Sequence, residues 1–282
     1  MTRLKYTFKN DVLFKMLFVK YPELLKRLVS ELLELRFESI EQFDITNPEM
    51  PPERLGDKFC RLDINMIVDG RRVNLEIQVR DEGDFPERSL FHWARDYSTA
   101  LAEGDDFSSL PRTIIISILG FKLFSSTEFH SEYQALEITR HTPLTDKMSL
   151  HYFELCKLPG LINAENGMEL WLALFNAETE EELKKLDVLE VPVMKQAIGA
   201  YRSITATPEF REMERLRSKA RHDEAQALKK ARLEESKKWQ SVVAGKDAVI
   251  ADKDAMLADK DAMLADKDAV IAKLRAQLGG KK

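Results

Sequence analysis

The chain has 282 residues, of which 44% are hydrophobic and 32% are charged, which suits one globular domain of ordinary size and an additional extended part. No stretch approaches the roughly 20 consecutive apolar residues that a membrane helix needs, and the first residues lack the apolar core of a signal peptide. The two cysteines, Cys60 and Cys156, have no His or Cys partner at metal-ligand spacing. We therefore expect a cytoplasmic protein that has no membrane contact, no disulfide framework and no zinc cluster.

The net charge of −5 is unevenly distributed along the chain. Residues 209–238 contain ten Lys/Arg and seven Asp/Glu, and residues 239–282 contain eight Lys/Arg and seven Asp, so the first 208 residues carry −9. Such an acidic part does not favour general binding to nucleic acid. Any DNA binding must come from a local basic patch, or from metal ions that bridge carboxylates to phosphates.

Two helices are predicted near the N-terminus. Asn10 can cap a helix that begins at Asp11, because the apolar residues after it recur at helical spacing. A second helix is predicted from about Pro22 to Leu35, with proline in its first turn. The proline-rich, polar segment 44–58 is predicted to be a loop.

After this loop the period of the pattern changes to two, which predicts a β-hairpin. Residues 62–68 and 73–79 alternate apolar with mostly polar side chains, and Asp69-Gly70 between them is a strong signal for a tight turn. A two-residue loop at Asp69-Gly70 sets Asp63 opposite Glu76 on one face of the hairpin.

Two facing carboxylates, about 5 Å apart at Cβ, repel each other unless a shared proton, a basic side chain or a divalent metal neutralises them. Asn65, Asn74 and Gln78 are predicted on the same face, and oxygen-rich sites of this kind suit Mg²⁺ or Mn²⁺. A one-residue bulge would move Asp63 off that face. The alternative is a polar strand face that simply contacts water.

The remaining pattern of the body predicts an α/β domain. A helix is predicted from Pro86 to Gly104, and the unbroken apolar run 113–121 favours a strand buried on both faces. A sheet covered on both sides would shield the two acids from solvent. The last predicted elements are a strand at Leu150–Leu155 and helices at 166–186 and 191–202.

The C-terminal part is predicted to be helical throughout. From Pro208 the chain is charged and rich in helix formers, and it then repeats seven residues as KDAVIAD, KDAMLAD, KDAMLAD and KDAVIAK. Seven residues suggest a coiled coil. The repeat offers an alanine seam, and also a wider seam of Val/Met with Ile/Leu that Lys interrupts.

These motifs together resemble a known nuclease fold. The hairpin RLDINMIVDGRRVNLEIQV (61–79) is similar to the core of the PD-(D/E)XK nucleases, in which an Asp ends one strand and (Asp/Glu)-x-Lys lies on the next. The chain more specifically resembles the recombination-promoting nuclease / putative transposase branch, in which Glu-x-Gln replaces Glu-x-Lys. The resemblance covers roughly residues 8–160 and includes NDVLFKMLF (10–18), GDKFCRLDI (56–64), FPERSLFHWARDYSTAL (85–101) and HYFELCKL (151–158).

The resemblance implies a role for each matching residue. Asp63 and Glu76 would be the main metal ligands, with the main-chain carbonyl of Ile77 as a third. Gln78 stands where the Lys would orient or polarise the attacking water, although a carboxamide cannot carry its charge. Asp11 stands where the fold often adds an acidic residue near the metal; the alternative is an ordinary Asp favoured by the helix dipole.

Basic residues that can contact DNA phosphates are the next expectation. The candidates are Lys15 on the first helix, Arg88, His92 and Arg95 on one face of the helix after the hairpin, and Arg112. The alternative in each case is a charged side chain that only contacts solvent.

The implied fold is a restriction-endonuclease-like mixed sheet flanked by helices, with a long C-terminal helical or coiled-coil tail. We expect a nuclease-like domain at 1–205, a charged helix at 206–240 and a heptad-repeat tail at 241–282. The implied activity is Mg²⁺-dependent cleavage of DNA, with Mn²⁺ as a substitute ion, in recombination or transposon-like elements. RNA is a weaker substrate candidate.

The alternative function is a catalytically weak nuclease fold that acts as a binding or assembly module, as a homo-oligomer formed through its repeat helix. The acidic body and the missing Lys favour this alternative. The facing pair of Asp63 and Glu76 favours the nuclease.

Overall fold

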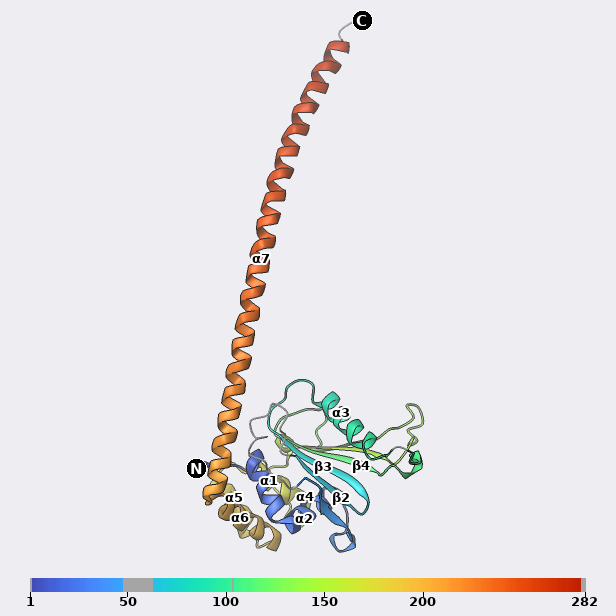
Figure 1. Cartoon of the computed structure of the whole chain (residues 1–282), viewed down its shortest axis with the longest axis vertical. Coiled ribbons are helices and arrows are strands. Elements are labelled where there is room, and N and C mark those ends of the chain that lie inside the picture. Colours follow the sequence, from blue (N-terminus) through green and yellow to red (C-terminus); the bar gives the residue numbers. More distant parts are fainter. Residues whose placement is uncertain (1, 48–62, 103, 280–282) are drawn as a thin grey trace. The chain divides into compact units, whose positions relative to one another are not determined.

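The computed structural model describes residues 2–47, 63–102 and 104–279 (Figure 1), so most of the predicted loop 44–58 lies outside the described residues. The chain divides into two compact units, Met1–Ala220 and Arg221–Lys282. The helices are α1 (Asp11–Lys20), α2 (Pro22–Leu32), α3 (Phe85–Ser98), α4 (Gly167–Asn176), α5 (Glu180–Val188), α6 (Pro192–Thr205) and α7 (Pro208–Gly279). The strands are β1 (Phe43–Ile45), β2 (Ile64–Val68), β3 (Arg71–Gln78), β4 (Thr113–Leu119), β5 (His130–Tyr133) and β6 (Met148–Glu154).

The first unit is built on a mixed sheet with the strand order β1-β2-β3-β4-β6-β5. β4 pairs in parallel with both β3 and β6, whereas the other neighbours are antiparallel. Every residue of β4 is buried, as predicted for a central strand covered on both faces. The observed architecture is the restriction-endonuclease-like mixed sheet that the resemblance implies.

Helices cover the two faces of the sheet unequally. Figure 1 shows α3 over one face and α1, α2 and α4 against the other. The larger core joins Ile64, Leu75 and Ile116 of the sheet to apolar side chains of α1, α2, α4 and α6. On the α3 face the core is small, and Phe85 packs there with Ile115, Leu119, Leu150 and Tyr152. This small core leaves room on the α3 face for polar side chains.

Several predicted boundaries and elements were wrong. The helix predicted to reach Gly104 ends at Ser98, and the one predicted to reach Leu35 ends at Leu32. The helix predicted at 166–186 is two helices, because Thr179 forms a capping box with Glu182 and starts α5. The edge strands β1 and β5 were not predicted, since three and four residues are too few for a clear alternating pattern.

The C-terminal helix α7 runs unbroken to Gly279, as predicted for this charged and repetitive segment. The described apolar side chains of α7 in the second unit are exposed; Val249, Ile250, Met256 and Leu257 each have more than half of their surface exposed. Among the described helices, none has the length and hydropathy that a membrane-spanning segment requires.

We predict that Thr179→Ala lowers the free energy of unfolding by about 1 kcal/mol, because the α5 capping box loses its hydroxyl acceptor. Urea unfolding followed by circular dichroism measures the change. Thr127→Ala, which removes an exposed threonine hydroxyl that donates to the neighbouring Glu128, is the control and should change stability little. Equal stability of the two variants would contradict the assigned cap.

Candidate active site

The β2–β3 hairpin has the register that the sequence predicts. Ile64 pairs with Leu75 and Asn65 with Asn74, without a bulge among the paired residues. The Asn74 side-chain amide donates to Asn65 Oδ1 at 2.5 Å, so these two side chains share one face. Asp69 and Gly70 both have positive φ, at 46° and 73°, as a two-residue hairpin turn requires.

Continued one rung beyond Ile64–Leu75, the same register would set Asp63 opposite Glu76. Glu76 is only 6% exposed, and its Oε1 accepts a hydrogen bond of 2.9 Å from Ser117 Oγ. Ser117 is the direct neighbour of Glu76 in β4. A buried carboxylate is costly unless hydrogen bonds or positive charge stabilise it, so this position favours a specific use of the Glu76 side chain.

A pair of hydroxyl groups lies on the same face as Glu76 and Ser117. Tyr152 of β6 follows Ser117 on the same rung, and its hydroxyl lies 2.5 Å from Ser89 Oγ of α3. Burial raises the pKa of Tyr152, and the negative charge of Glu76 raises it further. The carboxylate of Glu76 thus lies in a layer beneath α3 that is shielded from water, where interactions with a cation are strong.

Asp63 is half-buried and directly precedes β2. Its main-chain carbonyl accepts hydrogen bonds from Lys15 Nζ of α1, at 2.8 Å, and from Asn47 Nδ2, at 3.0 Å. The side chain of Asn47 also accepts from the main-chain N–H of Asn65, at 2.8 Å. Two different segments therefore hold the start of β2.

Gln78 and Ile77 end β3 and are both half-buried. The Gln78 amide donates to the carbonyl of Arg80 at 3.0 Å, so its carboxamide lies along the end of the strand. A carboxamide donates and accepts hydrogen bonds but takes no proton near neutral pH. This geometry suits orientation of a water molecule and does not suit proton abstraction.

Asp11, the remaining predicted acid, lies in the first turn of α1. Its Oδ1 accepts from the N–H of Val12 at 3.0 Å, and its Oδ2 accepts from Arg217 Nε of α7 at 2.8 Å. The neighbouring Asn10 caps α1 and donates to Glu214 of α7. These contacts tie α1 to the start of α7 and give Asp11 a structural role.

The predicted basic residues have different surroundings. Lys15 is 2% exposed and donates to main-chain carbonyls. Arg88 pairs with Glu82 at 2.6 Å and lies over the ring of Phe85. Arg95 is exposed on α3 and His92 is half-exposed. Of the predicted phosphate contacts, Arg95 has the position most accessible to a ligand.

The residues around Glu76 fit a hard divalent cation. The donors on this face are carboxylate, carboxamide and hydroxyl oxygens, the ligand types that Mg²⁺ and Mn²⁺ prefer. Within the described ranges, no three His, Cys, Asp or Glu side chains gather as metal ligands. A cation at this face would therefore have fewer than three such side-chain ligands among the described residues, and main-chain, water or phosphate oxygens would complete the coordination.

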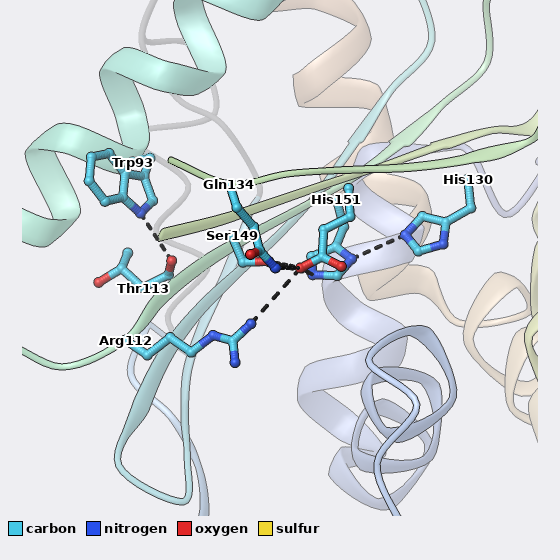
Figure 2. Close-up of polar contacts among 8 residues, drawn as sticks. Trp93, Arg112, Thr113, His130, Gln134, Ser149 and His151 are labelled. Atoms are coloured by element: carbon cyan, nitrogen blue, oxygen red, sulfur yellow. Dashed lines mark hydrogen bonds and ion pairs between the residues drawn. The ribbon is translucent and has the colours of Figure 1, made fainter. Parts of the chain in front are cut away.

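A second polar cluster lies on the opposite face of the sheet, on β5 and β6 (Figure 2). His130 Nε2 lies 3.1 Å from His151 Nδ1, and Ser149 Oγ lies 2.8 Å from His151 Nε2. Ser149 also donates to Glu132 Oε1 at 2.7 Å. An ionised carboxylate only accepts hydrogen bonds, so the single proton of the Ser149 hydroxyl is donated to Glu132. His151 Nε2–H must then donate to Ser149 Oγ. Nδ1 of the neutral His151 ring is therefore an acceptor, and His130 donates to it.

Ser149 beside His151 resembles a nucleophile next to a base, but the serine is not accessible to solvent or substrate. Ser149 is fully buried, so a substrate cannot reach its hydroxyl. Burial lowers the pKa of His151 to about 4, and the ring is therefore neutral at pH 7. We assign a structural role to this cluster and place the candidate active site at Glu76.

Sequence reasoning missed two contributors to the Glu76 site. Ser117 is a polar residue in the middle of the apolar run 113–121, and that contrast was a usable signal. Asn47 lies in a polar segment where its sequence context gives no such signal.

Comparison with known proteins gives one match. A family model described as PD-(D/E)XK nuclease family transposase matches residues 8–231. No curated protein and no solved structure matches the chain. The matched range includes the hairpin, the central strand β4 and the first turns of α7.

Removing the Ser117 hydroxyl should lower the stability of the fold, because the buried Glu76 carboxylate then loses a hydrogen-bond donor. We predict that Ser117→Ala lowers the free energy of unfolding by about 1–3 kcal/mol, because the buried carboxylate loses a charge-assisted hydrogen bond. In a double-mutant cycle with Glu76→Gln, the Ser117 effect should shrink. Additive effects of the two substitutions would show that the hydrogen bond contributes nothing.

The buried His151 predicts a pH dependence of stability. Its folded pKa of about 4 lies below the ordinary 6.5, so between these values the unfolded chain binds a proton that the folded protein does not. Stability is then fully present above pH 6.5 and falls toward pH 4, by at most about 1.4 kcal/mol per pH unit from this group. Urea unfolding at several pH values should show a shallower slope for His151→Gln. The exposed His222→Gln is the control, and an unchanged slope in both variants would contradict the assignment.

Proposed function

Because this chain belongs to the PD-(D/E)XK nuclease family transposases, we propose that it is a metal-dependent DNA endonuclease whose active centre contains Asp63 and Glu76. The observation that carries the proposal is the burial of Glu76, on the face that α3 covers and one rung beyond the pair Ile64–Leu75. A divalent cation bound at this depth would interact strongly with the carboxylate, because little water screens the two charges.

In the proposed reaction each residue has one task. Asp63 and Glu76 present carboxylate oxygens, and the carbonyl of Ile77 is the third protein ligand. A bound divalent cation would supply a water of lowered pKa and would stabilise charge on the phosphorane and the leaving oxygen. Ser117 fixes one oxygen of Glu76, and Gln78 orients the attacking water through its carboxamide.

Substrate binding has to overcome the acidic charge of the body. The exposed Arg95 on α3 is the candidate for direct phosphate contact. Asp11 stays a secondary candidate near the metal, in addition to its contact with Arg217. We propose Mg²⁺ as the ion, with Mn²⁺ as an active substitute, because both accept a site made entirely of oxygen donors.

Cleavage of a supercoiled plasmid tests the proposal. The purified protein should cut DNA in Mg²⁺ or Mn²⁺ and should be inactive in EDTA, whereas Asp63→Asn and Glu76→Gln should lose about 100-fold or more of the rate. Asp44→Asn is the matched control, since it removes an exposed carboxylate from the adjacent strand β1. Undiminished cutting by Asp63→Asn would reject the assigned site, and equal cutting of RNA would widen the substrate class.

A second role, assembly through the C-terminal repeat, has its own observation. Each seven-residue repeat in the C-terminal part of α7 exposes two neighbouring large apolar side chains, such as Met256-Leu257 and Met263-Leu264. Exposed apolar rows along a helix are typical of coiled-coil partners. We propose that a second copy of the chain covers them.

Sedimentation of the full chain tests this assembly. The protein should sediment as an oligomer, and Leu257→Lys combined with Leu264→Lys should shift it toward the monomer, because two charges enter the apolar contact. Lys253→Gln combined with Lys260→Gln is the control from the same heptads. A wild-type monomer at all concentrations would contradict the proposed self-association.

A further inference from the structure

Lys15 has surroundings that a solvent-facing or phosphate-binding lysine would not have. It lies in the middle of α1, where its neighbours Phe14 and Met16 belong to the main core, and it is 2% exposed. Lysine is almost never fully buried without a partner, because desolvation of its charge is costly. Its contacts therefore indicate what the charge is used for.

The described contacts of Lys15 lead to the start of β2. Its Nζ donates to the main-chain carbonyls of Asn47 and Asp63. A cationic donor makes a stronger hydrogen bond to a carbonyl than a neutral amide does. α1 thus holds both the segment that leaves β1 and the residue that precedes β2.

The side chain of Asn47 completes this arrangement by acting as an additional peptide group. Its Nδ2 donates to the carbonyl of Asp63 and its Oδ1 accepts from the N–H of Asn65. The main-chain N–H of Thr46 donates to the carbonyl of Asn65, at 2.8 Å. The pairing of β1 with β2 therefore continues past Ile45, and it ends at Asp63.

Asp63 needs such support because strand pairing alone does not fix it. The paired residues of the hairpin begin at Ile64, so Asp63 lies just outside the ladder. Its carbonyl oxygen receives both the Lys15 and the Asn47 donors. These two bonds restrict the main chain of Asp63, and through it the direction of the carboxylate.

We propose that Lys15 is a positioning residue of the active centre, which holds Asp63 through its main-chain carbonyl together with Asn47. This inference rests on the proposed function of Asp63 as a metal ligand. In this role Lys15 does not make the contact to a DNA phosphate that the sequence predicts, but donates from the protein interior to a main-chain carbonyl. Neighbours that orient a metal ligand typically change metal affinity by about 10-fold to 100-fold when they are removed.

The first experiment follows the position of Asp63 without using activity. Lys15→Met keeps the apolar stem and removes the cation, and circular dichroism shows whether the variant folds. The Asn65 amide, which Asn47 holds, should exchange its hydrogen at least about tenfold faster in this variant. Exchange of the Ile116 amide in β4 should not change. Asn47→Ala is the second variant and should act in the same direction.

The second experiment measures binding of Mn²⁺ alone to the DNA-free protein by electron paramagnetic resonance. Lys15→Met should weaken the Asp63-dependent binding about tenfold or more. The matched control is Lys26→Met, because Lys26 of α2 also donates to a main-chain carbonyl, that of Ile40 at 2.9 Å, in another part of the fold. Wild-type exchange and wild-type affinity in Lys15→Met would overturn the proposal.

Failure of the proposed function would look different from failure of this inference. If the wild-type protein neither cuts DNA nor binds Mn²⁺ through Asp63, the nuclease proposal fails. Faster exchange of Asn65 in Lys15→Met would still support the positioning of Asp63, and unchanged exchange would overturn it.

Discussion

The pairing of β2 with β3 is the constraint on which the candidate site depends. Side chains alternate between faces with a period of two, so a shift by one residue would move Glu76 into the large core and Leu75 under α3. The turn at Asp69-Gly70 fixes the register from one end. Lys15 and Asn47 hold the other end at Asp63. The strand pairing positions Glu76, and side-chain hydrogen bonds to the main-chain carbonyl hold Asp63.

The central strand β4 turns this hairpin into a buried site. Its parallel pairing with β3 sets Ser117 beside Glu76, and its pairing with β6 sets Tyr152 beside Ser117. α3 covers this polar row with the small core around Phe85. A carboxylate on a solvent-exposed strand attracts a cation weakly, because water screens the charges. The same group beneath a helix attracts a cation strongly, because the screening is smaller. Burial and hydrogen bonding together make Glu76 a candidate for chemistry.

Much of this arrangement could be predicted from the sequence. The alternation in 62–68 and 73–79, with Asp-Gly between, gives the hairpin and its register from local pattern alone. The contacts of Lys15 could not be predicted, because they join α1 to residues more than 30 positions away and no sequence period encodes them. The same holds for Asp11 and Arg217, which lie far apart in the chain. The short strands β1 and β5 depend on the sheet that they join and carry almost no signal of their own.

The central claim is that Asp63 and Glu76 hold one divalent cation on the α3 face of the hairpin. Crystals grown or soaked with Mn²⁺ test it most directly through anomalous scattering. The account predicts a peak within about 2.0–2.6 Å of oxygens from both carboxylates, which disappears in Asp63→Asn. A peak elsewhere on the protein, or side chains of Asp63 and Glu76 on opposite faces of the sheet, would contradict it.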